Sequence, residues 1–160
     1  MATTIQTDQF KIDLYNGGHN FTTSTGLTYK MLLIKVSPSG AYDKTLTNVG
    51  TPGSGTPTTS NVGTDEVTGT GYTSGGFTLT NVTAALYTDT AVVTFSVNPN
   101  WTTATFSAVA GVIYTTDSTK GTANRTVAVF DFGGTQTVSA GTFTVTLPAA
   151  AAATGLIRSL

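Results

Sequence analysis

Cysteine is missing from this sequence and histidine occurs only once, which excludes several kinds of chemistry. Without cysteine there are no disulfides, no thiolate metal ligands and no cysteine nucleophile. One histidine without cysteine also falls short of the usual zinc ligand set. The D-x-D-x-D-G calcium loop is absent too, although Asp43 or Asp117 could join backbone carbonyls in a looser loop site. We therefore expect no cofactor and no catalytic metal.

Charged residues are scarce as well, at 9% of the chain against an average of about 25%. With a net charge of −1, the surface exerts little long-range attraction on nucleic acid or on anionic lipid. We expect neither as a partner. Disorder is also unexpected, because 39% of the residues are hydrophobic. Threonine, with 37 copies, replaces charge and suits the half-exposed surface of a sheet.

Long apolar runs are lacking, and none approaches the roughly 20 residues of a membrane helix. The opening MATTIQTDQF has neither the basic nor the apolar region of a secretory signal, so we expect synthesis in the cytoplasm. A length of 160 residues fits one domain, residues 1–160. Within it we expect residues 1–7 to form an N-terminal arm.

One short helix is predicted over residues 7–16, where Thr7 or Asp8 can cap the start and Gly17 can end it. Phe10 and Leu14 would share its buried face. The first long strand is predicted over residues 27–36, whose run MLLI indicates burial on both faces or under the helix.

Residues 37–64 hold three of the five prolines and are predicted to form a long loop. Loops of this length inside a compact domain are usually functional or mobile, so this one is our candidate contact arm. Together with the N-terminal arm it supplies the candidate protein-contact residues, which are Ile5, Tyr42, Leu46, Val49 and Val62.

The rest of the chain reads as strands and turns. GTGYTSGG at 69–76 leads into a strand at 77–82, and further strands are predicted at 91–97, 104–115 (one or two) and 124–132. Residues 142–147 alternate strictly between threonine and an apolar residue, and GLIRSL closes the chain. The expected fold is all-β, an antiparallel sandwich of about seven to nine strands with one short N-terminal helix.

Few residues suggest catalysis. His19 lacks a local catalytic signature, so a structural or surface role is expected. Asp65 and Glu66 are adjacent, and in a strand their side chains would point to opposite faces, which disfavours a glycosidase pair. Asp131 could face inward from its strand, but an outward position is favoured. Trp101 is expected in the core rather than on a ligand surface.

Three stretches, taken in order, follow recognisable patterns. FKIDLYNGGHNF is similar to an FKxxLxxGxHNF opening, and DEVTGTGYTSGGFTLTNVT is similar to a NEVxGTGYxxGGxxLxxVT segment. The end, VAVFDFGGTQTVSAGTFTVTLPAAAAATGLIRSL, is similar to a DFGG followed by TFTVTxPA and a short apolar C-terminus. With these three patterns the chain resembles a type of small virion protein from tailed bacteriophages. The resemblance covers nearly the whole chain and departs from the pattern in Ser37–Thr64.

The resemblance implies a non-enzymatic structural protein of the virion, assembled in the host bacterial cytoplasm. Capsid decoration (cement) and minor capsid roles are both implied, with the major capsid protein and copies of itself, such as a trimer, as partners. An alternative is a tail or head-fibre component that binds host-surface carbohydrate through Tyr42, Tyr72 and Tyr87. A third hypothesis is an enzyme, a lyase or esterase, that would depend on His19.

Overall fold

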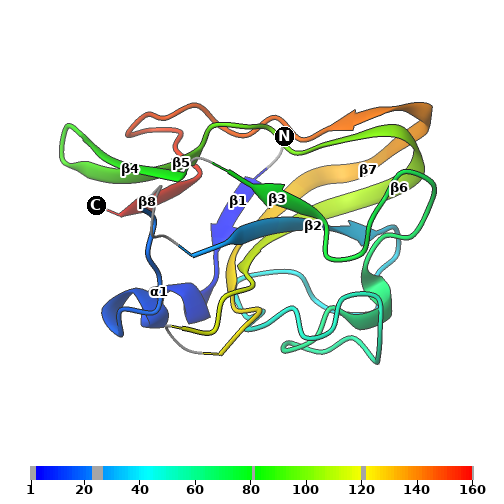
Figure 1. Ribbon diagram of the computed structural model, residues 1–160, viewed down its shortest axis with the longest axis horizontal. Coiled ribbons are helices and arrows are strands. Elements are labelled where there is room, and N and C mark those ends of the chain that lie inside the picture. The colour runs from blue at the N-terminus through cyan, green and yellow to red at the C-terminus, as the bar shows by residue number, and fades with distance from the viewer. Residues whose placement is uncertain (1–2, 23–26, 81, 120–121, 160) are drawn as a thin grey trace.

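The chain folds into two antiparallel sheets and one short helix (Figure 1). This computed structural model describes residues 3–22, 27–80, 82–119 and 122–159. Eight strands lie within the described residues, and the sandwich-like all-β fold predicted from the sequence is confirmed. The one α-helix of the described residues is too short to cross a membrane.

The larger sheet has five strands and the smaller sheet has three. The two longest strands of the larger sheet, β6 (Asn100–Thr115) and β7 (Thr126–Thr144), pair from Asn100 opposite Thr144 to Tyr114 opposite Thr126. The larger sheet runs in the order β1 (Thr3–Gln6), β7 (Thr126–Thr144), β6 (Asn100–Thr115), β2 (Tyr29–Lys35) and β3 (Phe77–Leu79). The smaller sheet runs in the order β4 (Val82–Tyr87), β5 (Thr90–Phe95) and β8 (Ile157–Ser159).

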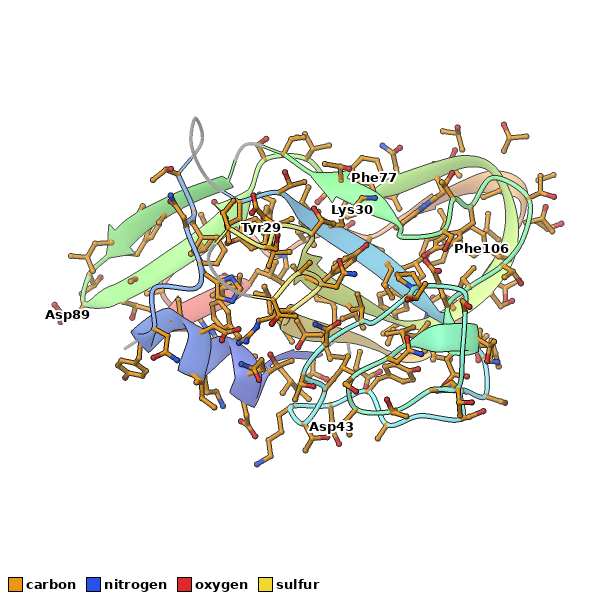
Figure 2. The ribbon with its side chains drawn as sticks, turned by 60° about the horizontal axis from the view of Figure 1, so that its bottom comes forward. Tyr29, Lys30, Asp43, Phe77, Asp89 and Phe106 are labelled. Atoms are coloured by element: carbon orange, nitrogen blue, oxygen red, sulfur yellow. The ribbon has the colours of Figure 1, made fainter. Side chains whose placement is uncertain are left out.

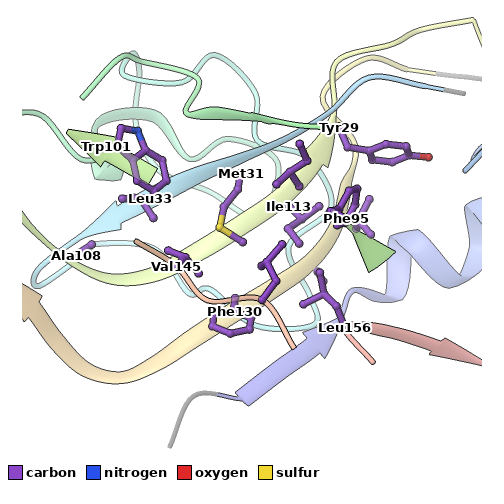
Figure 3. Packing of buried hydrophobic residues seen from close by; sticks show 14 of the residues in the cluster. Tyr29, Met31, Leu33, Phe95, Trp101, Ala108, Ile113, Phe130, Val145 and Leu156 are labelled. Atoms are coloured by element: carbon purple, nitrogen blue, oxygen red, sulfur yellow. The ribbon is translucent and has the colours of Figure 1, made fainter. Parts of the chain in front are cut away.

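β2 is buried on both faces, as its MLLI run predicts. Tyr29, Met31 and Leu33 point into one cluster, which also contains Phe95 from the smaller sheet (Figure 3). Trp101 belongs to the same cluster and is 5% exposed, so its predicted core position is confirmed. Leu32 and Ile34 point to the opposite face of the larger sheet, into a second cluster.

The helix α1 (Asp8–Tyr15) lies where the sequence predicts it. The Thr7 side chain accepts a hydrogen bond from the Phe10 amide at 3.2 Å, which caps the first turn. Phe10 is fully buried, but Leu14 is 41% exposed, so the shared buried face predicted for these two residues is wrong. In an eight-residue helix, Asp13 takes the second buried position because it meets the interior groups described below.

Three other boundaries correct the predictions. The N-terminal arm is wrong for Thr3–Gln6, which pair with β7 as an edge strand of the larger sheet. Most of the strand predicted at 124–132 and the first three residues of the strand predicted at 142–147 belong to one long β7, which ends at Thr144. The chain does not reverse between them, because residues 132–135 form a bulge opposite Val109. β4 was not predicted at all, although it is paired along its length with β5.

Candidate interaction surface

The residues 37–64 form no free arm. We call them the cover segment, because Leu46, Val49 and Val62 pack from it onto the second face of the larger sheet. All three are fully buried, so they have no accessible surface for a partner. The contact role predicted for them is therefore wrong: each fills space over Leu32 and Ile34 that water would otherwise occupy.

The carboxylate of Asp65 holds the start of the cover segment in place. Its Oδ2 accepts hydrogen bonds from the amides of Ser39 and Gly40, both at 2.7 Å, and from the Tyr42 hydroxyl at 2.9 Å. Its Oδ1 lies 3.1 Å from the Lys35 ammonium. Burial raises the pKa of Asp65, but these donors outweigh burial and leave the pKa below its usual value.

Glu66 belongs to a second, separate hydrogen-bond network. Tyr72 and Ser74 donate their hydroxyls to this buried carboxylate at 2.8 and 2.6 Å, and the Gly75 amide donates at 2.7 Å. The sequence does not single out Glu66 as a structural residue. The sequence feature that could have indicated this network is the GTGYTSGG turn, because Tyr72, Ser74 and Gly75 all lie in it. Asp65 and Glu66 thus serve two different anchors rather than one acid pair.

His19 lies in the interior beside α1. Its ring packs against Phe10, Phe21 and Tyr29, with centroid distances of 4.8, 5.8 and 6.1 Å. Nδ1 lies 3.3 Å from the Tyr29 hydroxyl, and Nε2 lies 3.7 Å from Oδ2 of Asp13. Burial lowers the pKa of His19 to about 4, against a smaller opposing effect of Asp13. At neutral pH this histidine is therefore an uncharged packing residue.

The Asp13 carboxylate beside it is also engaged. It forms an ion pair with Arg125 and accepts a hydrogen bond from the Gln9 amide at 2.9 Å. This arrangement ties α1 to Arg125, the residue directly before β7. The carboxylate that faces His19 thus anchors the helix.

The three tyrosines considered for carbohydrate stacking lie in different surroundings. Tyr42 donates to Asp65, and burial raises the pKa of its hydroxyl above the ordinary value. Tyr72 donates to Glu66 and packs against Trp101 at a centroid distance of 5.8 Å. Tyr87 is 38% exposed and projects from the β4–β5 hairpin. The structure does not bring the three together.

Acidic residues are dispersed in the described part of the chain. No group of three or more aspartate, glutamate, histidine or cysteine side chains lies close enough to hold a metal ion there. Asp43 and Asp117 each accept hydrogen bonds from their own turns, from the Thr45 and Thr119 amides respectively. Asp131 is exposed on β7 and accepts a hydrogen bond from the Gly133 amide at 2.8 Å, in the outward position that was favoured.

Exposed apolar side chains gather on β1, α1 and the β4–β5 hairpin instead. On β1, Ile5 is 38% exposed, which makes it the most exposed of the predicted contact residues, whereas Tyr42 is half-buried. Ile12 and Tyr15 stand out from α1, at 56% and 94% exposed. Sequence reasoning missed these helix residues, because only packing decides which face of a short helix is covered.

A groove of about 1120 Å³ lies between β1, α1 and the C-terminal segment that leads into β8. Its wall is held together where the Gln6 side-chain amide donates to the Arg158 carbonyl at 2.7 Å. The residues that line it are Thr3, Thr4, Ile5, Gln6, Lys11, Leu14, Tyr15, Pro148, Thr154, Gly155, Leu156 and Arg158.

The chain matches no protein-family model, and comparisons with curated proteins and with solved structures give no match.

Proposed function

We propose that this chain is a non-enzymatic structural protein of a tailed-phage virion, a capsid decoration or minor capsid protein that binds and stabilises the major capsid lattice. The observation that carries the proposal is the collection of exposed apolar residues on β1 and α1, in a chain with only 9% charged residues. Such a surface suits lasting contact with other proteins, because free monomers normally keep exposed apolar patches small and charged residues frequent.

The interior polar groups support the non-enzymatic part of the proposal. Oδ2 of Asp65 and both oxygens of Glu66 accept hydrogen bonds from nearby loops, and Oδ1 of Asp65 lies beside Lys35. The His19 ring packs against aromatic rings. A catalytic acid or base must reach a substrate proton, whereas these three side chains are engaged with the protein itself. Their geometry fits stabilisation of loops and of the helix.

The assignment to a virion rests on the resemblance found in the sequence. It spans the opening FKIDLYNGGHNF, the GTGYTSGG turn and the DFGG-to-C-terminus stretch. In the structure these stretches form α1, the donors of the Glu66 network, and the bulge and end of β7. They are therefore parts that specify the fold, and the resemblance supports a common architecture for this chain and those virion proteins.

The direct test is the protein composition of purified phage particles from the source that encodes the chain. We expect peptides of this chain at a stoichiometry comparable to that of a capsid or tail component. Particles that lack the chain altogether would end the proposal. Deletion of its gene should then lower the temperature at which the capsid releases DNA, and adding back the purified chain should restore that temperature.

A glycan array separates this role from carbohydrate binding by a tail or head fibre. We expect no specific glycan signal from the purified chain. A reproducible signal that is lost on Tyr87→Ala would move the function to host-surface recognition, because Tyr87 is the exposed tyrosine of the three considered.

A further inference from the structure

The β4–β5 hairpin is a projecting element with little of its surface covered. Figure 1 shows it extending away from the larger sheet, and Figure 2 places Asp89 at its outer end. Leu86 is 72% exposed and Tyr87 is 38% exposed, and the alanines before them are exposed as well. The outer edge of β4 has no strand partner among the described residues. Open edges and bare apolar side chains of this kind favour pairing with another chain.

The groove beside it has complementary properties. Its apolar wall includes Ile5, Leu14 and Leu156, and it runs along the outer edge of β1, which is also without a strand partner among the described residues. At about 1120 Å³ and open to solvent, it exceeds the roughly 300–1,000 Å³ of small-molecule sites. An open groove along an unpaired strand edge can accommodate a polypeptide segment.

Charge distinguishes the two surfaces. Lys11 and Arg158 line the groove, and no carboxylate does. Lys11 is already paired with Asp8 at 3.0 Å, so Arg158 is the cation that remains for a partner. The hairpin turn, Tyr87-Thr88-Asp89-Thr90, has one carboxylate and no cation. Arg158 donates to the carbonyls of Ala152 and Ala153 and forms no ion pair with a carboxylate of the described residues, so its guanidinium can pair with a carboxylate of another chain. Opposite charge on a convex and a concave apolar surface of the same molecule points to contact between copies.

We propose that the β4–β5 hairpin of one copy lies in the groove of a second copy, with Leu86 against the apolar wall and Asp89 paired with Arg158. The hairpin begins at the rim of its own groove, because Val92 of β5 pairs with Arg158 of β8. Two copies related by a two-fold axis, or a small ring, can therefore each give a hairpin and receive one. This contact goes beyond the proposed function, since it concerns the free protein and requires no particle.

The test is a charge exchange, read by sedimentation velocity of the purified chain across a range of concentrations. The wild-type chain should associate, and Asp89→Arg and Arg158→Asp should each raise the dissociation constant at least about tenfold. The double variant should recover association, because the pair is restored with reversed signs. A mixture of the two single variants should also associate, since an arginine hairpin then meets an aspartate groove.

Controls keep loss of fold apart from loss of contact. Asp43→Arg in the cover segment makes the same charge change at a distant turn and should leave association unchanged. Leu86→Ser should weaken association without touching any interior contact. Circular dichroism and thermal melting should match the wild type for every variant. A wild-type chain that stays monomeric at all concentrations, or single variants that associate normally, would overturn the proposal, while leaving the test of particle composition unaffected.

Discussion

The cover segment and the β4–β5 hairpin are opposites: the segment without regular secondary structure has buried apolar residues, and the regularly paired hairpin has exposed ones. The cover segment is irregular, yet its apolar residues Leu46, Val49 and Val62 are fully buried. The hairpin is regularly paired along six residues of β4, yet Leu86 is 72% exposed. Regular secondary structure and a buried position are thus separate properties in this molecule. Burial follows from having a second layer to pack against, and the outer part of the hairpin has none.

The irregular backbone of the cover segment is stable because side chains satisfy its polar groups. Asn61 accepts from the amides of Thr51 and Gly63 and donates to the carbonyls of Ser54 and Thr56. Asp65 holds the other end of the segment. An irregular segment has no neighbouring strand to pair with, so side chains supply partners for its amides and carbonyls. In the cover segment, side-chain amides and carboxylates therefore supply the hydrogen bonds that strand pairing supplies in the hairpin.

Among the variants that test this comparison, Leu46→Ala is expected to have the largest effect on the free energy of unfolding. Leu46 is fully buried in the second cluster, and removing its side chain leaves a cavity under the cover segment. We expect the free energy of unfolding to fall by about 3 kcal/mol. Chemical denaturation followed by tryptophan fluorescence measures it. A loss below about 0.5 kcal/mol would mean that the cover segment contributes little to the core.

A smaller effect is expected from Asp65→Asn, which keeps the shape of the side chain and removes its charge. Ser39, Gly40 and Tyr42 would then share a neutral acceptor, so we expect a loss of about 2 kcal/mol in the free energy of unfolding. Asp131→Asn is the matched control, because Asp131 is exposed and should cost less than about 0.5 kcal/mol. Equal losses from the two variants would contradict the anchoring role of Asp65.

His19, which packs beside α1, makes the free energy of unfolding depend on pH. Its pKa in the folded protein is about 4 and its ordinary value is 6.5, so the unfolded chain binds the proton more readily. Stability should therefore be full above the unfolded pKa and fall as the pH drops toward the folded one. Between pH 7 and 5.5 the expected loss from this residue is about 1 kcal/mol.

His19→Phe checks this assignment, because phenylalanine can stack between Phe10 and Phe21 and does not titrate. The variant should lose less stability than the wild type between pH 7 and 5.5, as measured by urea denaturation at each pH. Identical pH profiles for the two proteins would show that the loss comes from other groups.

The smallest effect on stability is expected from Leu86→Ala, the hairpin counterpart of Leu46→Ala. The free energy of unfolding of the isolated monomer should change by less than about 0.5 kcal/mol, because the side chain already faces solvent. The measurement is made at concentrations below those that support association. A large loss would mean that Leu86 packs within its own chain, which would remove the contrast with the cover segment.

The sequence by itself determined the class of the fold and several of its elements. The Thr7 cap and Gly17 mark α1, and the MLLI run marks a strand with two buried faces. The alternation at 142–147 indicates strand, and its first three residues are the last of β7. These are local properties, since each depends on residues a few positions apart and on the period of a helix or a strand. For the same reason Trp101 could be assigned to the core.

Only the tertiary structure decided which surfaces are free. The cover segment reads as a loop, but its three apolar residues meet the second face of the sheet, which is assembled from strands far away in the chain. The arm at Thr3–Gln6 became an edge strand because β7 offers it a partner more than 120 positions later. The groove arises where β1, α1 and the end of the chain come together. Exposure depends on such long-range packing, and local sequence patterns do not contain it.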